Sequence, residues 1–330
     1  MKKSITINMI MNMLLSVSNF VFPLITYSYV ARILLPEGTG KINFAQSVLS
    51  IFSYIASLGI YNYGIRECSK VREDREKLSK LAHEIVMVNL IATVIAYILL
   101  IGAILLIPKL KSNGLLIIVM SSTMLLNVLG IEWLYVAMEM YSYITIRSLL
   151  FKAVSVALIF LFIHTKEDYI IYGGLTIFAS SASYILNFIN ARKYIDFRWI
   201  GNYNLKKHIK PIMVFFSSSI IITIYGQFDS LMIGFLKGDV ENGIYGAAVK
   251  IKSIVTALTA SIGSVFIPQI TIAFKEKCKA SIVDLSTKYM RMICLLVWPI
   301  AIFSTICARD LLLFVCGSDY LAACGTLIVL

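Results

Sequence analysis

The chain carries few charged side chains for its length. Of its 330 residues, 15% are charged and 59% are hydrophobic, and the mean hydropathy is +0.84. Soluble globular domains carry about 25% charged residues, so this scarcity excludes an ordinary soluble fold. Long apolar segments separate the sparse charges, which indicates an all-α protein that crosses a membrane several times.

Motifs of the common catalytic sites are also missing. The sequence has no P-loop, no G-x-S-x-G, no H-E-x-x-H, no D-x-D loop and no histidine-rich loop. Its six cysteines form no C-x-x-C pair and its three histidines are isolated, so we interpret the cysteines as small apolar residues. We therefore expect no enzyme activity, no metal, no bound cofactor and no ATP-driven pumping by this chain.

Nine apolar segments are predicted membrane spans, because a helix needs about 20 residues to cross the hydrocarbon. They cover residues 4–31, 42–65, 85–107, 114–137, 149–163, 169–191, 211–236, 243–274 and 289–308. The uncharged first segment is too long for a signal peptide, so we expect it to be retained as a span. A tenth segment begins near Leu321 and stops at Leu330, from which we expect the chain to be a fragment.

Lysine and arginine alternate between the loops in a way that predicts the orientation. Loops expected inside hold Lys2 and Lys3, six basic residues in 66–80, Arg147, six in 192–210 and four in 275–288. The loops expected outside are less basic, so the positive-inside rule predicts a cytoplasmic N-terminus. We therefore interpret the net charge of +12 as a topology signal and expect no nucleic-acid partner.

The first span carries a polar stripe. At about 100° per residue, a band about 80° wide holds the side chains of Asn8, Asn12, Ser16, Asn19 and Thr26. Amide side chains face lipid only at a high cost, so we expect them to face a helix bundle or a wet cavity. Simple packing between helices is the alternative that this pattern leaves open. The seventh span repeats the theme with Ser219, Thr223, Gly226 and Ser230.

Three charged residues lie inside the predicted spans 211–236 and 243–274. At about 1.5 Å per residue, Asp229 lies about 8 Å beyond the midpoint of its helix, and Lys250 reaches a similar depth. Charge at this depth costs roughly 2.5 to 3.5 kcal/mol, so the two residues form either an ion pair or a functional site. Lys252 points roughly 160° away from Lys250, and we therefore favour Lys250 for the interior.

Other charges also lie within or at the ends of spans. Glu132 and Lys152, on the fourth and fifth spans, both fall in the inner half of the bilayer. We expect them to form a structural ion pair or to take part in ion coupling. Arg32 ends the first span and either snorkels to the headgroups or faces a central cavity.

Two similar segments that lie 203 residues apart predict an internal repeat. GKINFA at 40–45 and GIYGAA at 243–248 each follow a short turn with an acidic residue, and each opens the next span. The offset equals six spans, an even number, which predicts parallel repeats about an axis normal to the membrane. We expect an N-terminal lobe at 1–191, a basic linker on the inner leaflet at 192–210 and a C-terminal lobe at 211–330.

Several segments resemble one known family. YVARILLPEGTGKINFAQ at 29–46 closely resembles the first two spans of bacterial polysaccharide-repeat-unit flippases of the O-antigen type. LGI at 58–60 with GIRE at 64–67, Asp229 with GIYGAAVK at 243–250, and FVCGSDY at 314–320 are similar to further signatures of that family. The resemblance implies the multidrug/oligosaccharidyl-lipid/polysaccharide exporter fold, in which two six-helix lobes form a V around a cavity. Family members have more spans than this chain, so we expect its second lobe to be incomplete.

The same resemblance implies that the protein moves an undecaprenyl-pyrophosphate-linked oligosaccharide across the bacterial cytoplasmic membrane, for O-antigen or capsule biosynthesis. Arg32 and Lys250 would bind the pyrophosphate, and the sugars would be bound by Asn8, Asn12, Asn19, Gln46 and Ser219. A proton or sodium gradient would act through Asp229, with Glu132 and Lys152 as further candidates. Expected partners are membrane lipids, a polysaccharide polymerase and a chain-length regulator.

Other functions stay open at this point. A drug or cation antiporter on the same fold would export small amphipathic cations, although the basic character of the candidate site argues against it. A membrane-embedded polymerase or acyltransferase should have a large outer loop or a catalytic histidine, and the outer loops here are short. A non-functional truncated copy and a structural membrane partner are the remaining alternatives.

Overall fold

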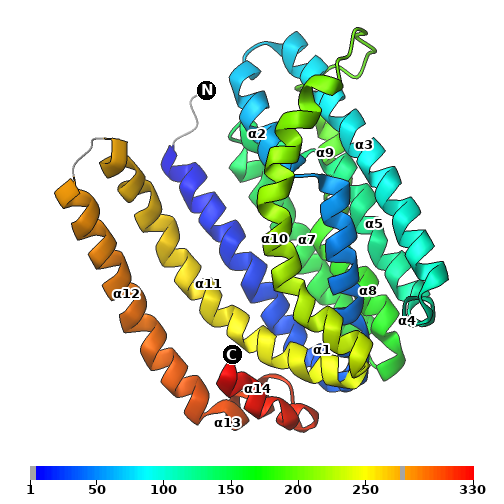
Figure 1. Ribbon diagram of the computed structural model, residues 1–330, viewed down its shortest axis with the longest axis vertical. Coiled ribbons are helices and arrows are strands. Elements are labelled where there is room, and N and C mark those ends of the chain that lie inside the picture. Colours follow the sequence, from blue (N-terminus) through cyan, green and yellow to red (C-terminus); the bar gives the residue numbers. More distant parts are fainter. Residues whose placement is uncertain (1–4, 276–278) are drawn as a thin grey trace.

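The computed structural model describes residues 5–275 and 279–330, and every element in these ranges is a helix (Figure 1). We call the helices of residues 5–191 the N-terminal bundle. It comprises α1 (Ile5–Ser57), α2 (Ile60–Val71), α3 (Arg75–Leu106), α4 (Pro108–Ser112), α5 (Gly114–Gly130), α6 (Glu132–Ala137), α7 (Tyr141–Phe162), η1 (Lys166–Asp168), α8 (Tyr169–Ile177), η2 (Phe178–Ala182) and α9 (Tyr184–Ala191). Then follow α10 (Lys206–Leu236), α11 (Asp239–Lys275), α12 (Lys279–Ile306), α13 (Ala308–Val315), η3 (Ser318–Ala323) and α14 (Cys324–Val329). The predicted all-α class is confirmed.

Long apolar helices also confirm the prediction of a multi-pass membrane protein. Five segments are long and apolar enough to cross a membrane: Ile10–Val71, Arg75–Leu106, Tyr141–Phe162, Lys166–Ala191 and Ile282–Ile306. Their outward faces are apolar as well, since Ile98, Leu105 and Leu161 expose 65%, 70% and 64% of their surface. Such faces are favourable in lipid and unfavourable in water, so we treat these helices as embedded in the bilayer.

Helix α1 contains the first predicted span from Ile5 onward, Ser4 lying outside the described residues, and most of the second. Leu35 has non-helical backbone angles (φ 58°, ψ 176°) directly before Pro36, and the chain turns back there (Figure 1). A residue that precedes proline is disfavoured in the α region, which explains the position of the turn. The second predicted span, 42–65, is not one helix, because Leu58 (φ 46°) and Gly59 (φ 73°) separate α1 from α2.

The fourth predicted span is broken too. Ile131 (φ 34°) separates α5 from α6 inside residues 114–137. A break inside a membrane leaves backbone groups without helical partners, and buried side-chain amides satisfy two of them here. Asn89 Nδ2 donates to the Ala56 carbonyl at 2.8 Å, and Asn187 Nδ2 donates to the Gly130 carbonyl at 2.7 Å.

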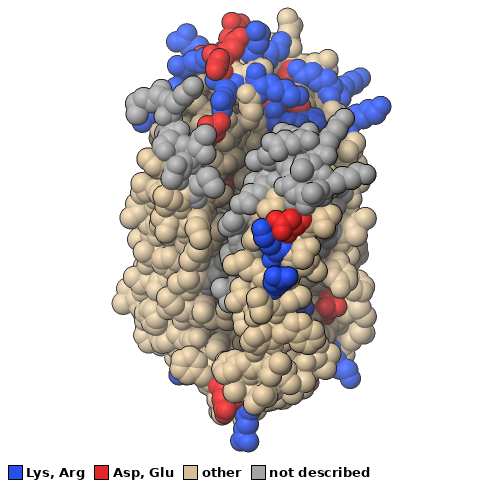
Figure 2. Space-filling view, turned by 90° about the vertical axis from the view of Figure 1, so that its left-hand side faces the viewer, with Lys and Arg blue, Asp and Glu red and all other residues tan. Residues whose placement is uncertain are grey.

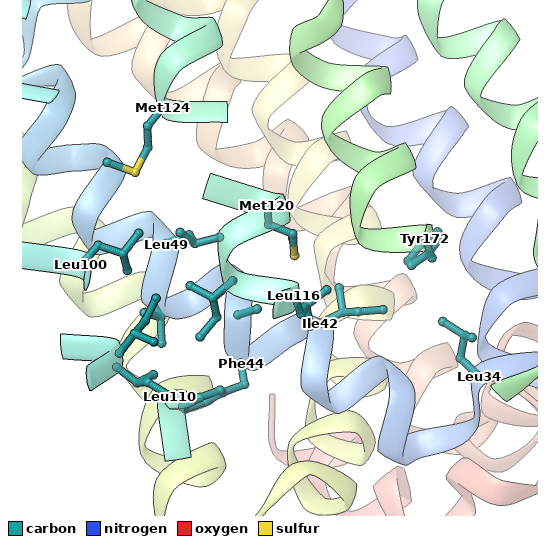
Figure 3. Packing of buried hydrophobic residues seen from close by; sticks show 14 of the residues in the cluster. Leu34, Ile42, Phe44, Leu49, Leu100, Leu110, Leu116, Met120, Met124 and Tyr172 are labelled. Carbon is teal, nitrogen blue, oxygen red and sulfur yellow. The ribbon is translucent and has the colours of Figure 1, made fainter. Parts of the chain in front are cut away.

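Helix α1 connects the N-terminal bundle to the helices that follow it, α10 to α14. It packs against α3, α5 and α7 of the N-terminal bundle and also against α10 and α11. Figure 1 shows α11 and α12 spreading away from α10 toward the end that carries α2. Figure 3 shows one buried core of the N-terminal bundle, in which Leu49 of α1 lies near Leu100 of α3, and Phe44 of α1 lies near Leu110 of α4. Another core joins α1 to α11, α13 and α14.

Lysine and arginine side chains gather at one end of the molecule, which we call the basic end (Figure 2). This end includes α2, the start of α3 and residues 192–210. Asp74 caps α3 there, and hydrogen bonds from Lys77 hold the pKa of the Asp74 carboxyl below its usual range. The other end, which we call the opposite end, holds the turn at Leu35, α4 and the start of α11. The expected membrane orientation stays a prediction.

The two copies of the predicted repeat touch each other at the opposite end. A Cβ atom on Gly40 would lie 1.6 Å from the Asp239 carbonyl oxygen, and one on Gly243 would lie 1.9 Å from the Pro36 carbonyl oxygen. Pro36 and Asp239 are 203 residues apart, as are Gly40 and Gly243, so the contacts are reciprocal under the predicted offset. Only glycine lets two backbones approach this closely. The number of helices in each lobe stays a prediction.

Candidate functional site

Lys250 of α11 lies against α1 without an acidic partner. Its ammonium nitrogen is 5.6 Å from the centroid of the Tyr27 ring. The contact between α1 and α11 also holds a buried apolar cluster that includes Tyr27, Ala31, Ala247, Ala248 and Ile251. The ion pairs formed by residues 5–275 and 279–330 do not include Lys250. A cation over an aromatic face gains about 0.5 to 2 kcal/mol, which offsets part of its desolvation but leaves the charge uncancelled.

Arg32 lies beside α13, near the turn in α1. Its Nη2 atom donates a hydrogen bond of 2.7 Å to the Phe314 carbonyl. Phe314 belongs to the last turn of α13, where carbonyls lack helical partners and carry the negative end of the helix dipole. A pocket of about 560 Å³ opens here, lined by Ile25, Ser28, Tyr29, Arg32, Ile33 and Phe314. A neutral acceptor therefore positions Arg32 at the edge of a pocket.

Asp229 of α10 is exposed and accepts a hydrogen bond of 2.9 Å from the Tyr245 hydroxyl. The ion pair that the sequence suggested between Asp229 and Lys250 is not among those of the described residues. Tyr245 and Lys250 are five positions apart on α11 and point about 140° from each other. Asp229 therefore contacts one side of α11, and Lys250 leaves α11 on another side.

Lys152 of α7 is 8% exposed and turns toward α1. Its ammonium donates to Ser18 Oγ at 2.9 Å and to Asn19 Oδ1. The expected ion pair with Glu132 is absent from the described part of the chain, where Glu132 instead shares a side-chain hydrogen bond with the Tyr184 hydroxyl. The break at Ile131 explains the difference, because it changes the direction in which Glu132 leaves its helix.

The remaining candidates do not converge on a single cavity. Asn8 is buried, and its Oδ1 atom has no hydrogen-bond partner in the described structure. Asn12 and Gln46 are exposed, and the Oδ1 atom of Asn19 accepts a hydrogen bond from Lys152. The stripe on α1 therefore lies partly on the contact with α7 and partly on the surface. Helix α10 includes Ser219, whose side chain lies outside the described residues.

Sequence reasoning missed the polar groups that join the two parts of the molecule. At the basic end, the fully buried Glu84 of α3 accepts a hydrogen bond from His208 Nε2 of α10 at 2.8 Å. At the opposite end, Lys109 of α4 forms a 2.7 Å ion pair with Asp239 of α11. A glutamate at the edge of an apolar segment was the available signal for the first group. No signal pointed to the second, because its partners are 130 residues apart.

The chain matches known proteins over most of its length. Residues 5–274 match the family described as "Polysaccharide biosynthesis protein". A protein of Escherichia coli (strain K12) named as an O-antigen transporter is 24% identical over 275 residues, which cover 82% of this chain and 66% of that protein. A Shigella dysenteriae protein with the same name is 22% identical over 268 residues, covering 80% and 67%. This chain thus spans about two thirds of the length of these relatives.

A solved transporter shares the fold. The structure titled as the inward-facing conformation of a multidrug resistance MATE family transporter of the MOP superfamily matches with a TM-score of 0.69 and 15% identity. The match covers 97% of this chain and 78% of that one. Likeness at this identity confirms the predicted exporter fold and carries no residue roles.

Proposed function

This chain is a member of the polysaccharide biosynthesis protein family, and from that premise we propose that it transports a lipid-linked glycan. The substrate we propose is an undecaprenyl-pyrophosphate-linked oligosaccharide repeat unit of an O-antigen or capsule. It would pass from the cytoplasmic to the outer leaflet of the bacterial cytoplasmic membrane. The names of the two curated relatives, both O-antigen transporters, support the polysaccharide class of the cargo.

The observation that carries this proposal is a pair of basic side chains without acidic partners. Arg32 of α1 donates to a carbonyl, and Lys250 of α11 lies over an aromatic ring, so both have neutral partners. An uncompensated cation at membrane depth is costly, and an anionic ligand removes that cost. Pyrophosphate fits both groups, because Arg binds phosphate through a planar fork and Lys binds it as a point charge.

The other parts of the substrate need less from the protein. Sugar hydroxyls need hydrogen-bonding amides, and the exposed Asn12 and Gln46 are candidates, together with the unpaired Oδ1 atom of Asn8. The polyprenyl tail stays in lipid.

We propose that the two lobes rock about the opposite end and that Asp229 couples this motion to a proton or sodium gradient. A polysaccharide polymerase and a chain-length regulator are the partners we propose.

The test replaces Lys250 with alanine in a bacterial strain that lacks its own flippase. We expect Lys250→Ala to lower surface glycan display at least tenfold at an unchanged protein level in the membrane, while Lys250→Arg retains part of it. The matched control is Lys252→Ala, since Lys252 is exposed two positions away on the other side of α11. Normal display by Lys250→Ala, or an equal loss by Lys252→Ala, would remove Lys250 as a phosphate ligand.

An antiporter of drugs or cations is the competing function on the same fold. Its substrates are cationic, so uncompensated basic groups at the site would repel them. A drug susceptibility assay separates the two functions. Expression of the intact chain should leave susceptibility to cationic dyes and drugs unchanged while it restores glycan display.

A further inference from the structure

The basic linker at 192–210, which leads from the N-terminal bundle into α10, lies folded on α3. Arg75 of α3 forms a 2.8 Å ion pair with Asp196. Further along α3, His83 Nδ1 shares a 2.9 Å hydrogen bond with the Tyr203 hydroxyl. These contacts give the linker a defined place at the basic end, beside the start of α3.

Most basic side chains of this linker have no acidic partner. Its one acidic residue, Asp196, is bound by Arg75. Lys207 pairs with the buried Glu84. The other basic side chains of the linker are exposed and form no ion pair within the described residues: Arg192, Lys193, Arg198, Lys206 and Lys210. Their charge is available to a group outside the chain, at the end where Figure 2 shows lysine and arginine gathered.

Two exposed aromatic side chains belong to the same linker. Phe197 and Trp199 expose 42% and 75% of their surface. The centroid of the Trp199 ring lies 4.8 Å from that of Tyr203, which is hydrogen-bonded to His83. His83 comes two positions before Ile85, where the uncharged segment of α3 begins. Trp199 therefore lies near the expected edge of the hydrocarbon, and tryptophan beside basic residues at that level is typical of a surface that contacts lipid headgroups.

We propose that the linker surface, formed by the five unpaired basic residues with Phe197 and Trp199, binds the headgroups of anionic phospholipids. Clustered lysine and arginine at a membrane surface are attracted to lipids with a net negative charge, such as phosphatidylglycerol. The phosphate of phosphatidylcholine is balanced by the ammonium of the same headgroup, so it attracts them less. The exposed Trp199 ring suits an environment that is apolar on one side and polar on the other. Arg32 and Lys250 take no part in this surface, so it stands independently of the proposed glycan transport.

The experiment measures which lipid collects around Trp199. The full chain is placed in nanodiscs of phosphatidylcholine with a minority of phosphatidylglycerol, and one lipid or the other carries bromine, which quenches tryptophan. Trp298→Phe removes a second exposed tryptophan, and adding Trp199→Phe gives the background from the buried Trp133. We expect brominated phosphatidylglycerol to quench Trp199 at least twofold more than its share of the lipid predicts. At about 1 M salt the Debye length falls to about 3 Å, so this excess should disappear.

Charge variants assign the excess to the linker surface. The test variant combines Lys193→Gln, Arg198→Gln and Lys206→Gln, and it should quench only in proportion to the lipid shares. The control carries the same change of charge at the opposite end, on three exposed lysines without ion pairs in the described residues: Lys111, Lys166 and Lys237. The control should keep the full excess. If the test variant does not fold, Arg198→Gln alone carries the test and should at least halve the excess.

Three outcomes overturn the proposal. Quenching in proportion to the lipid shares in the unaltered linker would show that the surface does not select anionic lipid. A full excess in the test variant would place the anionic lipid elsewhere. An acidic protein segment is the competing occupant: a shift of Trp199 emission by polyglutamate in nanodiscs of pure phosphatidylcholine, together with no excess of phosphatidylglycerol, would assign the surface to such a segment.

Discussion

Replacing Glu84 with glutamine should detach the basic end of α10 from the N-terminal bundle. The fully buried Glu84 carboxylate accepts hydrogen bonds from Lys207 Nζ at 2.6 Å, His208 Nε2 at 2.8 Å and Asn204 N at 2.8 Å. His208 Nδ1 also shares a hydrogen bond with the Tyr63 hydroxyl of α2. One carboxylate therefore joins α2, α3 and the start of α10.

The size of the effect follows from burial and charge. Removing a charged acceptor leaves buried donors unsatisfied, which costs about 1 to 3 kcal/mol for each and more where a charged group takes part. Here His208 is buried, but the Lys207 side chain is 48% exposed, so its share is screened and small. Glutamine keeps one acceptor oxygen and turns an N–H group toward existing donors. We expect a loss of about 3 kcal/mol.

The assay is thermal unfolding of the full chain in nanodiscs, followed by size-exclusion chromatography after heating. A loss of about 3 kcal/mol should lower the midpoint by about 5 °C or more in a protein of this size. Glu76→Gln is the control on the same helix, since Glu76 is exposed in the first turn of α3. A double-mutant cycle with His208→Gln should be strongly non-additive. A midpoint equal to that of Glu76→Gln, or an additive cycle, would refute this account of the cluster.

Two further predictions concern the opposite end. Gly40→Ala should reduce stability by at least about 3 kcal/mol or block assembly, because its Cβ would lie 1.6 Å from the Asp239 carbonyl oxygen; Gly102→Ala, with no atom within 4 Å, should be neutral in the same melts. Asp239→Asn should cost only about 1 kcal/mol, since the Lys109 and Asp239 side chains are 27% and 14% exposed. Lys109→Met should lose as much stability as Asp239→Asn, and the double variant should lose no more than either single variant. Additive losses of stability would contradict an ion pair between Lys109 and Asp239.

Much of the fold follows from the bilayer, which fixes the lengths of apolar segments. The predicted span 85–107 lies within α3 (Arg75–Leu106) apart from its last residue, and the predicted span 211–236 lies within α10. The breaks at Leu58 and Ile131 do not follow, because leucine and isoleucine are poor residues for positive φ. Tertiary contacts made by side-chain amides hold these breaks, and no local pattern reveals such contacts.

For the candidate site, the sequence predicts how far along its helix each charged residue lies, but not which neighbouring helix its side chain faces. Counting residues places Asp229 and Lys250 at one depth, and the structure turns them to different neighbours. The same holds for Lys152, which donates to Asn19 of α1 and forms no direct ion pair with Glu132 in the described part of the chain. Which side of a helix faces which neighbour depends on packing between helices far apart in sequence, and one sequence carries little of that information.

The charges at membrane depth share one property that the sequence did not suggest. Each contacts a neutral group. Arg32 donates to a carbonyl, and Lys250 lies over an aromatic ring. Lys152 donates to a hydroxyl and an amide, and Asp229 accepts from a phenol. Neutral partners orient a charged group and offset part of its desolvation, but they do not cancel its charge. An internal ion pair would have no need of a ligand. A charge that neutral groups hold in place still gains from a mobile counter-ion, so this arrangement suits anions at Arg32 and Lys250.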